Sequence, residues 1–215
     1  MSNKKIQHFL DQLEEHGWSL PIIGIDFQED EGRVWESKLG GCPYLRSAAD
    51  YPLGENGKPL LFMAQINLKE VPSIGLLPSE GMLQFFVGWD DVYGLYSSPV
   101  VRYIADIAES DDGLLTEHPF ADEAYRAALP FDEPCRMTFD PPVLSNEIYE
   151  DCQIGGYPYF PQDGELEPDE EFLLLQLADN CNIHFGDCGA CRFIITLEEL
   201  VNLDFSSVSY SWDCC

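Results

Sequence analysis

The segments GGCPYL (residues 40–45) and GGYPYF (residues 155–160) repeat nearly the same six residues within one chain. Two adjacent glycines permit positive φ angles, and the proline biases the residue before it towards an extended conformation. Each segment therefore predicts a tight turn. Because the match recurs so far along the chain, the pair also indicates an internal duplication.

The segments after each turn come in the same order: a turn-rich stretch, a short apolar run, a glycine-containing link and a second apolar run. Short apolar runs that contain β-branched and aromatic residues are typical of buried strands. The predicted strands are residues 60–68 and 82–89 after the first turn, and residues 172–179 and 190–196 after the second.

The spacing between corresponding residues supports the duplication. It is nearly constant and shortens only in loop-sized steps through the pairs Gly40/Gly155, Gln65/Gln176 and Gly81/Gly189. The strands of one copy cannot easily cover both of their own faces, so we expect the two copies to share one core. Repeat one spans about residues 38–97 and repeat two about residues 153–215 of a single domain covering 1–215; the alternative is chance similarity of two turns.

The remaining segments predict a few further elements. Apolar residues at helical spacing indicate an N-terminal helix over residues 3–17. Thr196 and Glu199 form a capping-box pattern that opens a short helix. Other strands are expected near residues 20–27, 98–107, 135–139 and 208–213, with a second short helix near 121–129. The expected fold class is therefore α+β and rich in strands.

The charge balance is strongly acidic. Eleven Lys and Arg residues face 39 Asp and Glu residues, which gives a formal net charge of −28. Nucleic acids and anionic membrane surfaces would be repelled, whereas a basic protein partner would be attracted. The alternative is that the charge serves solubility alone.

No stretch approaches the roughly 20 apolar residues that a membrane span requires. The first residues lack the apolar run of a signal peptide. We therefore expect a cytoplasmic protein whose eight cysteines are thiols.

A group of cysteines near the end of the sequence has the spacing of a metal site. Cys188 and Cys191 form a C-x-x-C motif, and His184 with Cys214 or Cys215 would complete the four ligands that zinc requires; Cys181 lies just upstream. The alternatives are buried thiols that act as small apolar side chains, or redox-active thiols. No other cofactor is expected.

No catalytic motif accompanies these residues. The four histidines fit neither a zinc-protease nor a hydrolase pattern, and the acidic runs lack the spacing of a calcium loop. The aromatic residues at the two turns, Tyr44, Tyr157 and Tyr159, are candidates for an interaction surface. The alternative is that they cover the ends of the core.

Several segments together resemble the YwqG-like family of bacterial proteins. They are GGCPYL, LLFMAQINL, LLPSEGMLQFF, DDVYG and the final stretch FGDCGACRFIITLEELVNLDFSSVSYSWDCC, which cover most of the chain from about residue 38. The resemblance implies a mixed α+β fold with a largely antiparallel sheet and a bacterial cytosolic setting. It implies no catalytic residues.

Two hypotheses for the function follow. The first is a non-enzymatic binding protein that uses its acidity to capture a basic partner, as an immunity protein would capture a nuclease-like toxin. The second is a small-molecule-binding protein or metal-dependent enzyme with a site between the two halves. The sequence does not indicate an oligomeric state.

Overall fold

The structure is a computed structural model that describes residues 2–55, 57–180 and 182–215. Contacts between Cα atoms divide the chain into two compact units. Unit 1 comprises Met1–Asp26, Val71–Ser79 and Phe139–Cys215, and unit 2 comprises Phe27–Glu70 and Glu80–Thr138. Each unit is built around its own antiparallel sheet.

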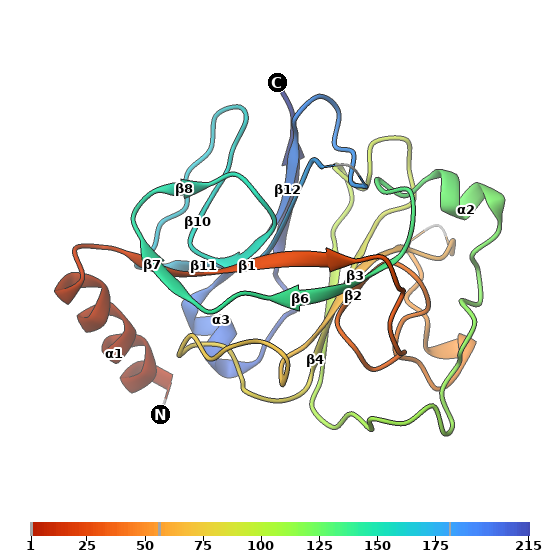
Figure 1. The fold of residues 1–215 in the computed structure, drawn as a ribbon, viewed down its shortest axis with the longest axis horizontal. Helices are drawn as coiled ribbons and strands as arrows, with labels where there is room; N and C mark the ends of the chain where they lie inside the picture. Colours follow the sequence, from red (N-terminus) through yellow and green to blue (C-terminus); the bar gives the residue numbers. More distant parts are fainter. Residues whose placement is uncertain (1, 56, 181) are drawn as a thin grey trace. The chain divides into compact units, whose positions relative to one another are not determined.

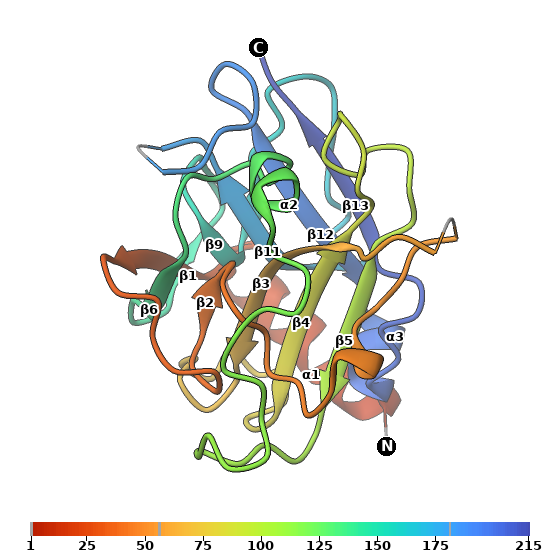
Figure 2. The ribbon, with the colours of Figure 1, turned by 90° about the vertical axis from the view of Figure 1, so that its right-hand side faces the viewer.

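The sheet of unit 2 has the order β6-β2-β3-β4-β5, with every neighbouring pair antiparallel. Figure 2 shows β3, β4 and β5 side by side. The strands are β2 (Lys38–Leu39), β3 (Leu61–Asn67), β4 (Met82–Val87), β5 (Val100–Ile104) and β6 (Cys135–Phe139). A 3-10 turn η1 (Ala48–Asp50) and a short helix α2 (Glu123–Ala127) complete the unit.

The sheet of unit 1 has the order β1-β9-β11-β12-β13, also antiparallel. Helices α1 (Ser2–Glu15) and α3 (Leu197–Asn202) contact each other, and both are visible in Figure 1. The strands are β1 (Leu20–Gln28), β9 (Gln153–Gly155), β11 (Glu171–Ala178), β12 (Ala190–Thr196) and β13 (Ser209–Asp213). β7 (Val143–Ser145) pairs with β1, and β8 (Ile148–Tyr149) forms a parallel pair with β10 (Tyr157–Pro158).

The central strands are buried on both faces, which explains their continuous apolar sequences. Every residue of β3 and of β4 is buried, and so is nearly all of β11 and β12. The few polar residues in these strands, among them Gln65, Gln84, Gln176 and Arg192, are also buried. A buried polar group must be hydrogen-bonded to avoid a large desolvation cost, so these residues indicate specific polar contacts.

The two sheets share more than their strand order. β3 pairs with β4 around an irregularity between Phe62 and Ala64, and β11 pairs with β12 around one at the corresponding place, between Leu173 and Leu175. In both turns the two glycines have positive φ, from 58° to 72°. This backbone conformation favours glycine, which explains the repeated GG sequence.

The β-rich α+β fold class, the largely antiparallel pairing and the N-terminal helix are confirmed. The helix expected at residues 3–17 is α1, which ends at Glu15 because Gly17 adopts a φ of 61°. Strand β5, in the sheet of unit 2, lies beyond residue 97, which is the predicted end of repeat one. Of the described helices, none is long and apolar enough to cross a membrane.

Candidate functional site

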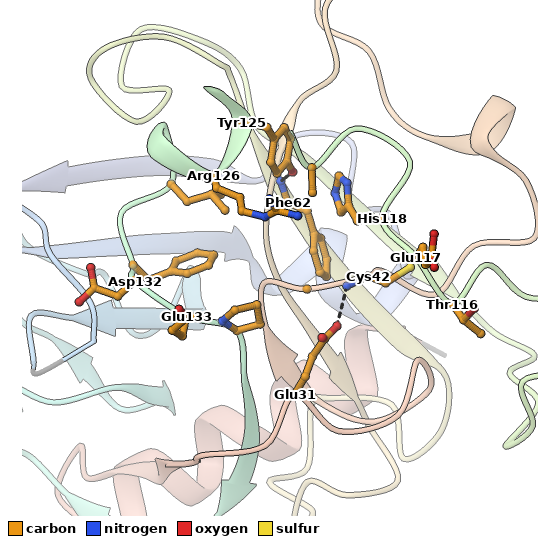
Figure 3. A pocket seen from close by; sticks show the side chains of 15 residues that line it. Glu31, Cys42, Phe62, Thr116, Glu117, His118, Tyr125, Arg126, Asp132 and Glu133 are labelled. Carbon is orange, nitrogen blue, oxygen red and sulfur yellow. Dashed lines mark hydrogen bonds between the residues drawn. The ribbon is translucent and has the colours of Figure 1, made fainter. Parts of the chain in front are cut away.

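A cavity of about 630 Å³ lies within unit 2, beside the first glycine turn. Figure 3 shows it from close by, with Tyr125 and Arg126 entering from α2 and Phe62 from β3. Its volume is within the range of about 300–1,000 Å³ that is usual for ligand pockets. The cavity is therefore the first candidate for a functional site.

The first glycine turn shapes one wall. Gly41 has a φ of 72°, and a Cβ atom at this position would overlap the carboxylate of Glu31. Glu31 Oε1 accepts a hydrogen bond from the backbone N–H of Cys42 at 2.9 Å, drawn as a dashed line in Figure 3. Glycine is thus required both by the backbone conformation and by the close approach of Glu31.

Lys38 supports this wall from inside the sheet. Its side chain is 1% exposed, and its Nζ lies 3.6 Å from Glu31 Oε1. The Nζ makes no hydrogen bond to another described residue. Burial lowers the pKa of Lys38, while the carboxylate of Glu31 opposes this shift. The ion pair therefore holds Glu31 over the turn.

Cys42 lines the cavity with a protonated thiol. Its Sγ lies 3.4 Å from the carbonyl oxygen of Leu115. Burial raises the pKa of Cys42 to about 11, and Lys38 only partly offsets this. Because the thiolate is the nucleophilic form, Cys42 is unreactive near neutral pH.

His118 belongs to a buried hydrogen-bond network. Its Nδ1 accepts a hydrogen bond from the backbone N–H of Phe120 at 3.1 Å, so Nε2 carries the proton and donates to the hydroxyl of Tyr51 at 3.1 Å. Burial, reinforced by the charge of Arg126, lowers the pKa of His118 to about 4. The ring is therefore neutral at pH 7.

The tyrosines complete this network. The hydroxyl of Tyr51 donates to the carbonyl of Leu60 at 2.9 Å and lies 2.7 Å from the hydroxyl of Tyr125. The hydroxyl of Tyr125 accepts a hydrogen bond from the backbone N–H of Phe62 at 2.7 Å. Tyr125 in turn donates to Tyr51, so each of these polar groups has a partner. The network fixes α2 against β3.

The remaining charged groups make the cavity acidic. Glu117, Asp132 and Glu133 are exposed around the cavity, in addition to Glu31, and Arg126 is the cation among the lining residues. Figure 3 shows these carboxylates on different sides of the cavity. Because Glu31 is paired with Lys38, three further carboxylates stand against one guanidinium, which favours a positively charged ligand group.

The two glycine turns are held by equivalent hydrogen bonds. Gln65 accepts from the backbone N–H of Tyr44 and donates to the carbonyls of Val34 and Glu36. Gln176 accepts from the N–H of Tyr159 and donates to the carbonyls of Tyr149 and Asp151. These three partners occupy the same places relative to the second turn as the partners of Gln65 do relative to the first. The internal duplication stays a prediction, and it would account for these shared contacts.

One strand further along, the equivalent positions differ in charge. Gln84 on β4 donates to the carbonyl of Tyr44 at 3.1 Å, whereas Arg192 on β12 donates to the carbonyl of Tyr159 at 2.7 Å. The buried guanidinium of Arg192 is paired with Asp213 at 2.7 Å. The carbonyl of the turn tyrosine thus accepts from a neutral amide in unit 2 and from an ion-paired guanidinium in unit 1.

The predicted interaction tyrosines have different environments. Tyr44 is 4% exposed, and its hydroxyl accepts from the backbone N–H of Ala108, which favours the alternative that its ring covers the core. Tyr157 and Tyr159 are half-buried, and Tyr157 donates to the carbonyl of Trp18. An interaction role for the three residues stays a prediction.

The predicted zinc ligands are spread over different environments. Cys191 is fully buried in β12, Cys188 is exposed in the preceding turn, and Cys214 packs beside this turn. His184 Nδ1 lies 3.9 Å from Asp179 Oδ1. Cys181 lies outside the described residues.

Within the described ranges, no three or more His, Cys, Asp and Glu side chains form a group suited to a metal ion. The zinc site stays a prediction. Burial raises the pKa of Cys191 to about 12, so this thiol is protonated at neutral pH.

Sequence reasoning did not find the cavity residues Glu31, His118, Tyr125 and Arg126. Glu31 comes from the loop after β1, and the other three come from the region around α2, so no local motif unites them. Lys38 stands two residues before the first glycine of the turn, after the polar residues Glu36 and Ser37, and only the structure shows that it is buried. A lysine at such a position requires a carboxylate partner, which is Glu31.

A family model described as a domain of unknown function (DUF1963) matches residues 37–214. This match covers most of the chain, so the protein belongs to that family. The match does not carry the YwqG-like designation, which stays a prediction. No curated protein matches the chain.

Proposed function

We propose that this protein is a non-enzymatic binding protein whose acidic cavity in unit 2 receives a positively charged side chain of a basic protein partner. The observation that carries this proposal is the surplus of carboxylates around the cavity, where Glu117, Asp132 and Glu133 stand against a single Arg126, in addition to Glu31, which is paired with Lys38. The net charge of −28 acts in the same direction at longer range.

The protonation states of the cavity side chains favour binding over nucleophilic or acid–base catalysis. Catalytic thiols have lowered pKa values, and catalytic histidines titrate near the working pH. Cys42 has a pKa of about 11 and His118 one of about 4. Both groups are neutral and occupied by hydrogen bonds at pH 7.

A basic toxin of the nuclease type is the partner class that we propose. Such an enzyme carries a basic surface for nucleic acid, and an acidic protein covering that surface would neutralise it. Electrostatic steering would make association fast and strongly dependent on salt.

The test is capture of basic proteins from host lysate at low and at high salt, followed by binding measurements with the captured partner. Glu117→Gln combined with Glu133→Gln removes two carboxylates from the cavity. Glu165→Gln combined with Glu170→Gln is the matched control, because it changes the net charge equally at exposed positions of unit 1.

We expect the cavity variant to weaken binding at least tenfold and the control to weaken it less than threefold. Equal losses of affinity in both variants would show that net charge alone drives binding and would refute a role of the cavity as the binding site. The absence of any captured basic protein at low salt would refute the proposal as a whole.

A second candidate function is the binding of a small cationic molecule, which the cavity volume of about 630 Å³ favours. Titration calorimetry with polyamines and with guanidinium compounds separates the two candidates. A small ligand that binds wild type, but not the cavity variant, would support this second function. A metal-dependent enzyme stays a further hypothesis, for which metal analysis of protein purified without added zinc is the direct test.

A further inference from the structure

Three cysteines meet where β12 and β13 pair. The two strands are antiparallel and lie side by side in Figure 2. Their register ends with Ala190 opposite Asp213. One step further, Gly189 faces Cys214: a Cβ atom on Gly189 would lie 3.0 Å from that of Cys214. The next residues are Cys188 on one side and Cys215 on the other.

A backbone hydrogen bond beyond the paired strands brings these last two residues close to each other. Cys188 has a φ of 56°, a left-handed conformation that is unusual for a side-chain-bearing residue. The backbone N–H of Cys215 donates to the carbonyl of Asp187 at 3.2 Å. Cys215 therefore lies beside the Asp187–Cys188 pair.

The surroundings of Tyr159 also place Cys188 and Cys215 in one neighbourhood. Burial is the first cause that raises the pKa of Tyr159, and the nearby Cys215 and Cys188 raise it further. Both cysteines thus lie near one tyrosine. Cys214 lies instead beside Gly186, since its Sγ would be 2.7 Å from a Cβ atom on that residue.

We propose that Cys188 and Cys215 form a reversible cross-strand disulfide. The N–H of Cys215 is hydrogen-bonded to the residue next to Cys188, and a disulfide can span Cα atoms about 4.4–6.8 Å apart. Both cysteines are exposed, so an oxidant reaches them without unfolding. Cys191, in contrast, is fully buried and is protected.

The oxidant is a low-molecular-weight disulfide such as oxidised glutathione. The thiolate of one cysteine attacks this disulfide, forms a mixed disulfide and releases one glutathione thiolate. The second cysteine, as its thiolate, attacks the protein sulfur of the mixed disulfide and releases the other glutathione. Two protein thiols are oxidised, one glutathione disulfide is reduced to two thiols, and the two protons pass to the glutathione thiolates.

The functional consequence is a covalent link between the ends of β12 and β13. Tyr159 of the second glycine turn, whose carbonyl accepts from Arg192, lies beside this link. Oxidation would therefore restrain the turn, while reduction would release it. The inference concerns unit 1 and does not depend on the proposed cavity in unit 2.

The experiment treats the full chain with oxidised glutathione at pH 8 and maps disulfides by mass spectrometry of non-reduced peptides. We expect loss of two reactive thiols and one peptide pair that links Cys188 to Cys215, restored by dithiothreitol. Cys188→Ser and Cys215→Ser should each abolish the pair. Cys214→Ser, the matched control next to it, should leave the pair unchanged.

Several results would overturn the proposal. They are a Cys188–Cys214 or Cys214–Cys215 link as the main product, stable glutathione adducts on Cys188 and Cys215, or no reaction while the protein stays folded. Circular dichroism before and after oxidation shows whether the fold is retained. A link that forms only in denatured protein would also refute a site built by the fold.

Discussion

At the residue scale, two buried glutamines hold the two glycine turns in place. Gln65 and Gln176 each accept one backbone N–H and donate to two backbone carbonyls of a neighbouring loop. An amide is the side chain that offers both a donor pair and an acceptor at one point. This requirement explains why a polar residue interrupts each apolar strand.

Replacing Gln176 by Leu should lower the free energy of unfolding by about 3 kcal/mol, because three backbone groups lose their partner in a buried site. Gln176→Glu keeps the acceptor but loses both donors, and should be similarly destabilising at pH 7. Urea unfolding followed by circular dichroism measures both changes. Losses below about 0.5 kcal/mol in both variants would contradict the role of the amide.

His118 provides a prediction of pH dependence. Its pKa is lowered from 6.5 to about 4 in the folded protein, so the unfolded chain binds the proton first. The neutral ring therefore contributes stability that is fully present above pH 6.5 and is lost as the pH falls towards 4. Arg126 and Glu31 are the charged groups that act on the ring, with opposite effects on its pKa.

The measurement compares the urea midpoints of wild type and His118→Gln between pH 7 and pH 4.5. Glutamine retains an amide N–H for the hydroxyl of Tyr51 but does not titrate in this range. We expect wild type to lose more stability than the variant as the pH falls. Parallel curves for the two proteins would contradict a neutral, buried His118.

At the element scale, the glycine turns are the features that sequence and structure share most clearly. Gly155 has a φ of 69°, and a Cβ atom there would overlap the backbone carbonyl of Pro21. Gly17 has a similar φ of 61° but no atom within 4 Å of such a Cβ. Alanine substitutions at the two positions therefore distinguish the energetic cost of the backbone conformation from the cost of the close contact.

Gly17→Ala should cost about 1 kcal/mol, the usual penalty for a non-glycine residue in the left-handed region. Gly155→Ala should cost at least twice as much, because a backbone carbonyl cannot move aside as a flexible side chain would. Chemical denaturation of both variants tests the difference. Equal costs would show that the turn of unit 1 relaxes around the added methyl group.

The capping box of α3 gives a second prediction at this scale. The side chain of Thr196 accepts from the N–H of Glu199 at 3.2 Å, and the carboxylate of Glu199 accepts from Thr196. Thr196→Ala should lower stability by about 1 kcal/mol. Glu198→Ala, at an exposed position of the same turn, should change it by less than about 0.5 kcal/mol. The reverse ranking in thermal unfolding would contradict the cap.

Elements with a strong local pattern could be predicted from the sequence, and those without one could not. The runs that became β3, β4, β11 and β12 were recognised because both faces of these strands are buried. Five short strands, β2, β7, β8, β9 and β10, have two or three residues each and carry no period. They form because neighbouring strands supply hydrogen-bond partners, which is a tertiary effect.

At the scale of the whole molecule, the candidate site was beyond local sequence reasoning. Glu31 and Cys42 lie near the first glycine turn, and His118 and Arg126 lie around α2, so the site joins two regions that are far apart in the chain. The raised pKa of Cys42 and the lowered pKa of His118 follow from burial, which depends on the finished fold. The acidic charge, in contrast, was fully readable from composition, and it leads to the last prediction.

A net charge of −28 implies strong self-repulsion among exposed carboxylates of the folded chain. The Debye length is about 10 Å at 0.1 M salt and about 3 Å at 1 M, so added salt screens this repulsion. We expect the urea midpoint to rise between 20 mM and 500 mM sodium chloride. A variant with Glu14, Glu15, Glu165 and Glu170 replaced by Gln should show a smaller rise, since fewer exposed charges remain to be screened. A midpoint that falls with salt would mean that attractive ion pairs such as Arg192–Asp213 outweigh the repulsion.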